Sequence, residues 1–346
     1  MKKVLSVFLV ITMLFLSCSM AAFAVTNSDS ASAVRKAFKV ETDSSIYEYD
    51  YYYYSPVKGS GDKTKYPIII WLHDQFSTVF ERQQLTSYNI AYWACDEYQS
   101  RIRGTGGAFL YLPRDPNIDI AWSGESSKLK RDIDLFISRY SENIDTNRIY
   151  VGGLSMGGRG TMRLVAQYPD FFAAAFPISP VYSPTDVELR GMAKVPTWLI
   201  SNKYDYLVSH STLQDVWKYL NQYSSTPHLN RWALFNTMRM YEPDGRLIPE
   251  PIYYTHDTWT AACNDLYMDD NTPYKHINVI NGNSYPVKMQ YPQGLLYWMS
   301  SQGYDENGSS GDNSGNNSQG GIISGITNIF KQIFDLFRKM IEIIMG

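Results

Sequence analysis

A Gly-x-Ser-x-Gly motif, Gly153-Leu154-Ser155-Met156-Gly157, constrains the fold of this chain more than any other feature. Residues 148–152 before it are typical of a strand, and residues 160–168 after it have helical spacing. In that context the motif indicates a sharp strand-to-helix turn that lifts the serine above a sheet. Glycine is needed on either side of the serine, because a side chain there would meet the neighbouring strand or helix. The motif therefore predicts a strand–turn–helix unit that presents Ser155 at a helix N-terminus.

Strand-like and helix-like segments alternate on both sides of this turn. Tyr66–Leu72 is a continuous apolar run, typical of a strand that is buried on both faces. Further strands are expected at residues 46–54, 108–112, 148–152, 173–179, 195–201 and 231–235, and helices at 128–140, 160–168 and 213–223. Because 44% of all residues are hydrophobic, the chain can bury a sizeable core. The alternation predicts an α/β fold, with a mostly parallel sheet and helices on both of its faces.

The N-terminal residues 1–24 have the features of a secretory signal peptide. Lys2 and Lys3 precede an apolar stretch, and Ala22-Phe23-Ala24 matches a small-residue cleavage site. Cys18 lies in a poor lipoprotein sequence, so lipid attachment is the lesser alternative. We expect cleavage after Ala24 and a secreted, extracellular protein.

Four segments are expected after the signal peptide: a flexible leader at 25–37, the folded catalytic domain at 38–302, a Gly/Ser/Asn linker at 303–321 and an amphipathic helix at 322–346. Most charges of the last segment fall on one helical face, and apolar residues cover the rest. Such a wide apolar face needs a partner in water. A membrane surface, a second copy and the catalytic domain are the candidates, and the linker favours an anchoring or self-association role. The protein would then be associated with the cell surface.

Charge and cysteine content exclude several other classes. The formal net charge is −3 and no basic run is present, so we expect no nucleic-acid partner. The five histidines and the cysteines show no metal-ligand spacing, so we expect neither a metal nor a cofactor. Once the signal peptide is removed, Cys95 and Cys263 are left as a candidate disulfide.

A serine hydroxyl is a weak nucleophile unless a base accepts its proton. In chains with this turn the order is serine, then an acid, then histidine. We select His256, because it follows a strand-like stretch and precedes a helix-like one. The other histidines after Ser155 are placed less suitably in the expected order of elements: His210, His228 and His276.

The carboxylate that orients the histidine is expected in the loop after the strand at 195–201. Asp205 is the only carboxylate in that loop, and it would fix the imidazole tautomer. Asp257 is a sequence neighbour of the histidine and reaches its Nδ1 poorly, whereas Asp186 and Asp244 lie outside the loop. The alternative role for Asp205 is that of a turn-forming residue, and we favour the catalytic role.

An oxyanion formed at the serine needs two backbone N–H donors. One is expected from Met156, directly after the serine, and the other from Asp74 or Gln75, after the strand Tyr66–Leu72. The aromatic neighbours of the acid and the histidine are the candidate substrate-pocket residues: Tyr204 and Trp259.

Four segments together resemble a known family: YPIIIWLH, IDTNRIYVGGLSMGG, SNKYD and HDTW. They are similar to the secreted esterase branch of the α/β-hydrolases, which includes feruloyl and acetylxylan esterases and polyhydroxyalkanoate depolymerase-like enzymes. The resemblance covers about residues 47–297 and is sharpest over 144–159. It implies an α/β-hydrolase fold and a serine esterase that works through an acyl-enzyme, with Ser155, His256 and Asp205 as the triad. A feruloyl or acetyl ester on plant polysaccharide is the substrate class it suggests.

The chain departs from the family pattern at Asp74, where such enzymes usually have glycine. A carboxylate turned toward an oxyanion would repel it, so either Asp74 points away, Gln75 supplies the donor, or activity is weakened. Residues 237–252 look like an insertion that could form a wall or lid beside His256.

Two other hypotheses about the function of the chain remain open. A prolyl-oligopeptidase-like peptidase shares the fold and the triad order, but no propeller repeats precede the domain. A non-catalytic binding or surface protein could also use this scaffold.

Overall fold

The computed structural model describes residues 37–41, 45–74, 90–116, 122, 124, 126–236, 256, 273–275 and 294–305. The chain divides into two units, Met1–Tyr304 and Asp305–Gly346, and all described residues but Asp305 belong to the first. The signal peptide, the insertion at 237–252 and the C-terminal amphipathic helix lie outside the described residues and stay predictions.

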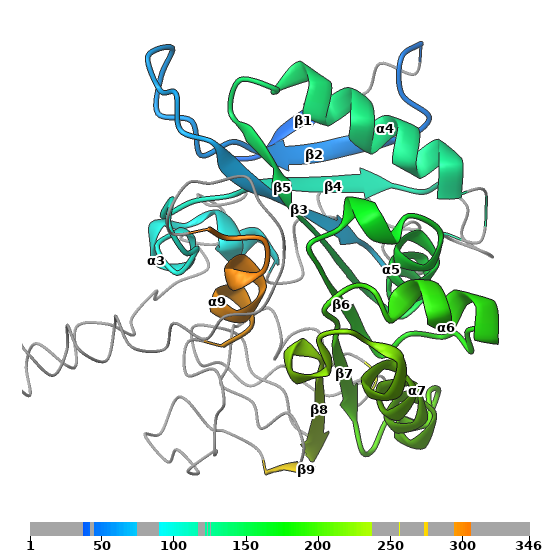
Figure 1. Ribbon diagram of the computed structural model, residues 1–346. Coiled ribbons are helices and arrows are strands. Elements are labelled where there is room, and N and C mark those ends of the chain that lie inside the picture. Colours follow the sequence, from blue (N-terminus) through cyan, green and yellow to red (C-terminus); the bar gives the residue numbers. More distant parts are fainter. Residues whose placement is uncertain are drawn as a thin grey trace, which may run out of the picture. The chain divides into compact units, whose positions relative to one another are not determined.

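The described strands form one nine-stranded sheet in the order β1-β2-β4-β3-β5-β6-β7-β8-β9 (Figure 1). β1 pairs with β2 and β2 with β4 in antiparallel fashion, and all other neighbours are parallel. Their bounds are β1 Lys39–Glu41, β2 Asp50–Tyr54, β3 Tyr66–Leu72, β4 Phe109–Arg114, β5 Ile144–Leu154, β6 Ala174–Ile178, β7 Trp198–Asn202, β8 Arg231–Asn236 and β9 Pro273–Lys275.

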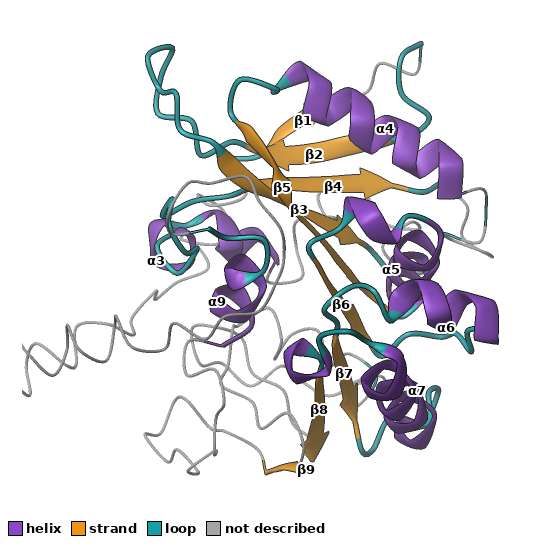
Figure 2. Cartoon of the chain, in the orientation of Figure 1, coloured by secondary structure: helices purple, strands orange, loops and turns teal. Residues whose placement is uncertain are grey.

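Helices cover both faces of this sheet, as Figure 2 shows. Their bounds are η3 Ile90–Ala94, α3 Asp96–Gln99, α4 Ser126–Arg139, α5 Met156–Gln167, η4 Pro169–Phe171, α6 Asp186–Met192, α7 His210–Tyr223, η5 Pro227–Leu229 and α9 Gly294–Ser301. The predicted α/β fold with a mostly parallel sheet is confirmed. Each strand and helix expected between residues 46 and 235 is present, with bounds that differ by a few residues in either direction. The strand-like stretch before His256 and the helix-like stretch after it lie outside the described residues and stay predictions. In the part of the chain that is described, no helix is long and apolar enough to span a membrane.

Strand β3 shows how the sheet divides the core into two clusters. Ile69 and Trp71 point to one face, which is covered by η3, α3 and α9, whereas Ile68, Ile70 and Leu72 point to the other, which is covered by α4–α7. All seven residues of β3 are buried, as expected for a strand with helices on both sides. The alternation follows from the two-residue repeat of a strand.

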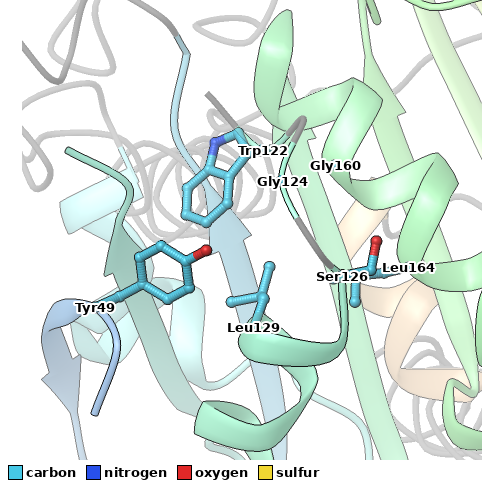
Figure 3. A pocket seen from close by; sticks show the side chains of 7 residues that line it. All are labelled: Tyr49, Trp122, Gly124, Ser126, Leu129, Gly160 and Leu164. Atoms are coloured by element: carbon cyan, nitrogen blue, oxygen red, sulfur yellow. The ribbon is translucent and has the colours of Figure 1, made fainter. Parts of the chain in front are cut away.

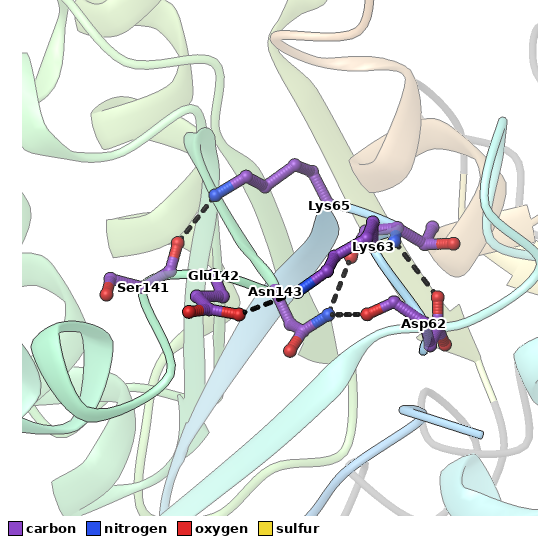
Figure 4. A network of polar contacts seen from close by, with 7 residues as sticks. Asp62, Lys63, Lys65, Ser141, Glu142 and Asn143 are labelled. Atoms are coloured by element: carbon purple, nitrogen blue, oxygen red, sulfur yellow. Dashed lines mark hydrogen bonds and ion pairs between the residues drawn. The ribbon is translucent and has the colours of Figure 1, made fainter. Parts of the chain in front are cut away.

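Polar contacts tie β3 and β5 together where these two parallel strands begin (Figure 4). Lys63 forms an ion pair with Glu142 at 3.0 Å, and Asn143 Nδ2 donates to the Asp62 carbonyl at 2.8 Å. Lys65 Nζ donates to the carbonyl of Ser141. These contacts lie at the end of the sheet opposite to Ser155, which follows the last residue of β5.

The start of β5 also holds α9 through a buried arginine. Arg148 is 2% exposed and donates to the carbonyls of Arg103, at 2.7 Å, and Ser300, at 3.1 Å. Its guanidinium lies 5.0 Å from the ring centre of Tyr304, and Gly303 adopts a φ of 69° against Asn147. The first residues of the predicted linker are therefore packed on the folded unit.

The strand order reverses direction between β3 and β5, two central strands of the sheet. From β3 the chain moves to β4 on one side and then returns to β5 on the other. In open α/β sheets ligands bind at such a reversal, outside the carboxyl ends of the strands. A binding site is therefore expected among the residues that follow β3 and β5.

Candidate active site

Ser155 occupies a strained turn between β5 and α5. Its backbone has φ 55° and ψ −111°, a conformation that costs a residue with a side chain about 1–3 kcal/mol. The Ser155 N–H donates to the carbonyl of Ile178, at the end of β6, over 2.9 Å. Its own carbonyl accepts from Arg159 at 3.0 Å and from Val181 at 3.2 Å. The serine is thus fixed by both its helix and the neighbouring strand.

The glycines of the motif are required by close packing against β3. A Cβ added at Gly157 would overlap the Leu72 carbonyl and lie 2.7 Å from the His73 carbonyl oxygen. A Cβ at Gly153 would overlap the same Leu72 carbonyl and lie 2.7 Å from the carbonyl carbon of Gly157. Each clash is with backbone, which cannot rotate away. This packing agrees with the steric reason for glycine that the motif predicts at these positions.

Asp205 and His256, which are 51 residues apart in the chain, meet at the same edge of the sheet. His256 Nδ1 lies 2.9 Å from Asp205 Oδ2 and 3.1 Å from Oδ1. The Asp205 carboxylate is fully buried, and its Oδ1 accepts the backbone N–H groups of Leu207, at 2.9 Å, and Val208, at 3.0 Å. The carboxylate is therefore held by its own loop, and its other oxygen faces the imidazole.

The second nitrogen of His256 is turned away from the acid. Nε2 is buried and has no hydrogen-bond partner among the described residues, Ser155 included. Ser155 follows β5 and Asp205 follows β7, and only β6 separates these parallel strands. Their ends are therefore roughly 10 Å apart, from the usual strand spacing. Contacts between a catalytic hydroxyl and its base are often long without substrate and shorten when it binds.

The two predicted sources of backbone donors lie beside Ser155. Met156 is the first residue of α5, where an N–H has no acceptor within the helix. Asp74 follows β3 and is 7% exposed, and its carbonyl accepts from His73 Nδ1 at 2.6 Å. Gln75, the other candidate, lies outside the described residues.

Apolar side chains are exposed around the ends of β6 and β7. Val181, which contacts the Ser155 carbonyl through its N–H, is 40% exposed. In the acid loop Tyr204, Tyr206 and Leu207 are 44%, 49% and 53% exposed. Several exposed apolar side chains in one loop are typical of a surface that binds an apolar ligand. Tyr204 was a predicted pocket residue, whereas Trp259 lies outside the described residues.

Three residues beside the site were not singled out from the sequence. His73, Asp115 and Trp122 are buried and hydrogen-bonded to one another at the ends of β3 and β4. The sequence does not predict this cluster, because His73 lies far from Asp115 and Trp122 in the chain and the three residues form no motif.

The remaining predictions concern cysteine and metal. Cys95 is a free cysteine among the described residues, whereas Cys263 lies outside them, so the Cys95–Cys263 bridge stays a prediction. Within the described ranges, no group of three or more His, Cys, Asp or Glu side chains is arranged to hold a metal ion.

Two curated proteins resemble this chain in sequence. "Cutinase est2" of Thermobifida alba is 29% identical, over 31% of this chain and 48% of the cutinase. "Poly(3-hydroxyalkanoate) depolymerase C" of Paucimonas lemoignei is 28% identical, over 35% of this chain and 29% of the depolymerase. The chain thus spans less than half the length of either relative. No family model matches it.

The same architecture occurs in a solved structure of a thermostable esterase. The two share a TM-score of 0.52 and 22% sequence identity, over 67% of this chain and 61% of the esterase. At that identity the likeness shows the fold alone. The chain is thus similar in sequence to a cutinase and a poly(3-hydroxyalkanoate) depolymerase and in fold to a thermostable esterase, and its resemblance to α/β-hydrolase esterases is distant.

Proposed function

We propose that this protein is a serine esterase in which Ser155, His256 and Asp205 form the catalytic triad. The observation that carries the proposal is the buried Asp205–His256 contact of 2.9 Å, while the second imidazole nitrogen has no hydrogen-bond partner among the described residues. A carboxylate on Nδ1 keeps the proton there, so Nε2 is free to accept a proton. The strained turn at the end of β5 presents the only hydroxyl that the motif predicts for this role.

The reaction follows from these positions. His256 takes the Ser155 proton as the hydroxyl oxygen attacks the ester carbonyl, and a tetrahedral oxyanion forms. The N–H groups of Met156 and of the Asp74–Gln75 segment stabilise that oxyanion. His256 then protonates the leaving alcohol, which departs and leaves an acyl group on Ser155. Water, deprotonated by His256, attacks the acyl-enzyme and releases the acid.

Mapping the nucleophile tests the proposal directly. Purified protein is incubated with a fluorophosphonate probe, and turnover of p-nitrophenyl acetate is measured in parallel. Labelling at position 155 and turnover should both disappear in Ser155→Ala. Ser179→Ala is the matched control, because Ser179 directly follows the next strand, β6, and also has a positive φ of 40°. Its hydroxyl has no hydrogen-bond partner among the described residues, so the substitution removes no bond there. Labelling elsewhere, or an inert wild type that still binds a glycan, would refute the proposal.

The substrate is proposed as an ester with an apolar or aromatic part. The exposed Tyr204, Tyr206 and Leu207 beside the acid support this choice, since aromatic and aliphatic groups offer an apolar surface. Feruloylated and acetylated oligosaccharides should be compared with a polyhydroxyalkanoate film, because two relatives are named for polyesters. Faster turnover of aminoacyl p-nitroanilides than of all these esters would instead identify a peptidase.

Export and surface association complete the proposal. The features of residues 1–24 support secretion, and Edman sequencing of the exported protein should begin at Val25. The apolar face predicted over 322–346 supports binding to a membrane surface or to a second copy. Vesicle sedimentation and light scattering of the full chain, with and without residues 322–346, distinguish these two partners.

A further inference from the structure

A closed ring of hydrogen bonds joins the loops that follow β3 and β4. The backbone N–H of Asp115 donates to His73 Nε2 at 2.9 Å. Asp115 Oδ2 in turn accepts the backbone N–H of Trp122 at 2.7 Å, and the indole Nε1–H of Trp122 donates to the His73 carbonyl at 2.8 Å. All three residues are buried, with exposed fractions of 7% or less. Because a buried donor or acceptor without a partner destabilises the folded protein, the loss of any one of these hydrogen bonds is unfavourable.

These hydrogen bonds determine which nitrogen of the His73 imidazole carries the proton. Because Nε2 accepts a hydrogen bond, the proton of the neutral imidazole sits on Nδ1, from which it is donated to the Asp74 carbonyl at 2.6 Å. Burial lowers the pKa of His73 and so favours the neutral ring. The Asp74 carbonyl therefore accepts from the His73 imidazole, and the backbone N–H of Asp115 determines the tautomer of that imidazole.

Trp122 is held in this ring against its own backbone preference. Its φ is 59°, which is a strained value for a bulky residue. The indole lies 4.9 Å from the His73 ring and 5.7 Å from the Tyr49 ring, and a Cβ added at Gly160 would lie 2.7 Å from the Trp122 Cβ. Strain of this kind persists only where the surroundings enforce it, and it clusters at functional sites.

Packing alone does not fix the indole. A small cavity adjoins it, lined by Tyr49, Trp122, Leu129 and four further residues (Figure 3). A side chain next to open space can shift when its hydrogen bonds are removed. The Nε1–H bond to His73 and the backbone bond to Asp115 therefore act together with the His73 and Tyr49 contacts to hold the indole in place.

We propose that Trp122 and Asp115 are positioning residues that hold the backbone after β3 in the geometry required to stabilise the oxyanion. They act through His73, which grips the Asp74 carbonyl, and they do not contact the substrate. The proposal rests on the proposed esterase function. Donors aimed at an oxyanion act in the transition state and not on the bound ester. A displaced donor should therefore lower kcat and leave KM unchanged.

Trp122→Phe is the principal variant, because it keeps a ring and removes the indole N–H. We expect kcat to fall by about 10- to 100-fold, the cost of a displacement of about 1 Å near the reacting atoms, with KM changed by less than about twofold. Trp298→Phe is the matched control: Trp298 is fully buried on the opposite face of the sheet and donates to the Leu229 carbonyl at 3.2 Å. It loses an equivalent bond and should lower only the melting temperature.

A second pair of variants serves if Trp122→Phe does not fold. Asp115→Asn keeps an oxygen that can accept from the Trp122 N–H and should retain kcat, whereas Asp115→Ala removes it and should lower kcat as Trp122→Phe does.

The outcomes separate this proposal from the proposed function. If the fluorophosphonate probe fails to label Ser155 in the wild type, the esterase itself is refuted and the positioning role falls with it. If the wild type is labelled and active but Trp122→Phe and Asp115→Ala keep their kcat, the positioning role alone is wrong. A rise in KM at constant kcat would also overturn it, because the indole would then be a substrate contact.

Discussion

Replacing Asp205 by asparagine should convert His256 to the wrong tautomer. In the structure Oδ1 of Asp205 accepts two backbone N–H groups, from Leu207 and Val208, while Oδ2 faces His256 Nδ1. An asparagine must place its carbonyl oxygen at the Oδ1 position, because an amide NH₂ there would oppose two donors. Its NH₂ group then faces Nδ1 and donates to it. The imidazole proton is forced onto Nε2, which can no longer accept the proton of Ser155.

The expected loss is large because the base is removed while its position is kept. A tautomer error of this kind lowers kcat by about 10⁴-fold in serine protease triads, which corresponds to about 5 kcal/mol of transition-state stabilisation. Stability should change little, since the two backbone N–H groups of the loop keep their acceptor. KM should also be unchanged, because ground-state binding of the ester does not use the proton.

Two measurements check this chain of reasoning. Steady-state kinetics with p-nitrophenyl acetate give kcat, and two-bond ¹H–¹⁵N spectra of histidine-labelled protein give the tautomer of His256. Asp205→Ala is the comparison, because it should lose activity and also stability, as two buried N–H groups are left without an acceptor. If Asp205→Asn retains kcat within about tenfold of the wild type, or if Nδ1 still carries the proton, the assignment of the triad is wrong.

Three further outcomes are expected. Gly157→Ala should lower the free energy of unfolding by about 4 kcal/mol or more in denaturant titrations, since its Cβ would overlap backbone, whereas Gly61→Ala, in open space, should be neutral. The free energy of unfolding should fall as the pH drops below about 6.5, because His73 takes up a proton in the unfolded chain but not when it is buried in the folded one. His73→Gln should weaken this dependence of stability on pH, and an unchanged dependence would show that His73 is not its cause. Lys63→Ala should leave the denaturant midpoint of unfolding nearly unchanged, because its ion pair with Glu142 is solvent-exposed.

The sequence predicted the sheet well because β3, β6 and β7 are short apolar runs that must be buried on both faces. It did not reveal β1 or β9, which are three residues each and lie at the edges, where pairing with a neighbour decides the structure. The helix α9 was also missed, since its position depends on the buried Arg148 at the far end of β5.

The same distinction between local and distant signals applies to the candidate site. Ser155 could be found because its motif is local: five residues specify the turn, and their glycines are explained by one neighbouring strand. Asp205 could be found from the order of elements, since the loop after β7 holds a single carboxylate. Trp122 had no such signal. It donates to a residue 49 positions earlier, from a loop whose sequence does not predict its strained backbone.

The proposed mechanism needs both the strand ends and the hydrogen bonds between the loops. Parallel strands deliver Ser155, Asp205 and Asp74 to one edge of the sheet regardless of loop sequence, so their approximate placement follows from the fold. Stabilising an oxyanion requires placement within about half an ångström, which strand ends alone do not provide. The hydrogen bonds from Asp115 and Trp122 to His73 supply a fixed geometry for the backbone beside Ser155. A chain with the same motif but without this ring should fold in the same way and bind the same ester, yet it should turn over more slowly.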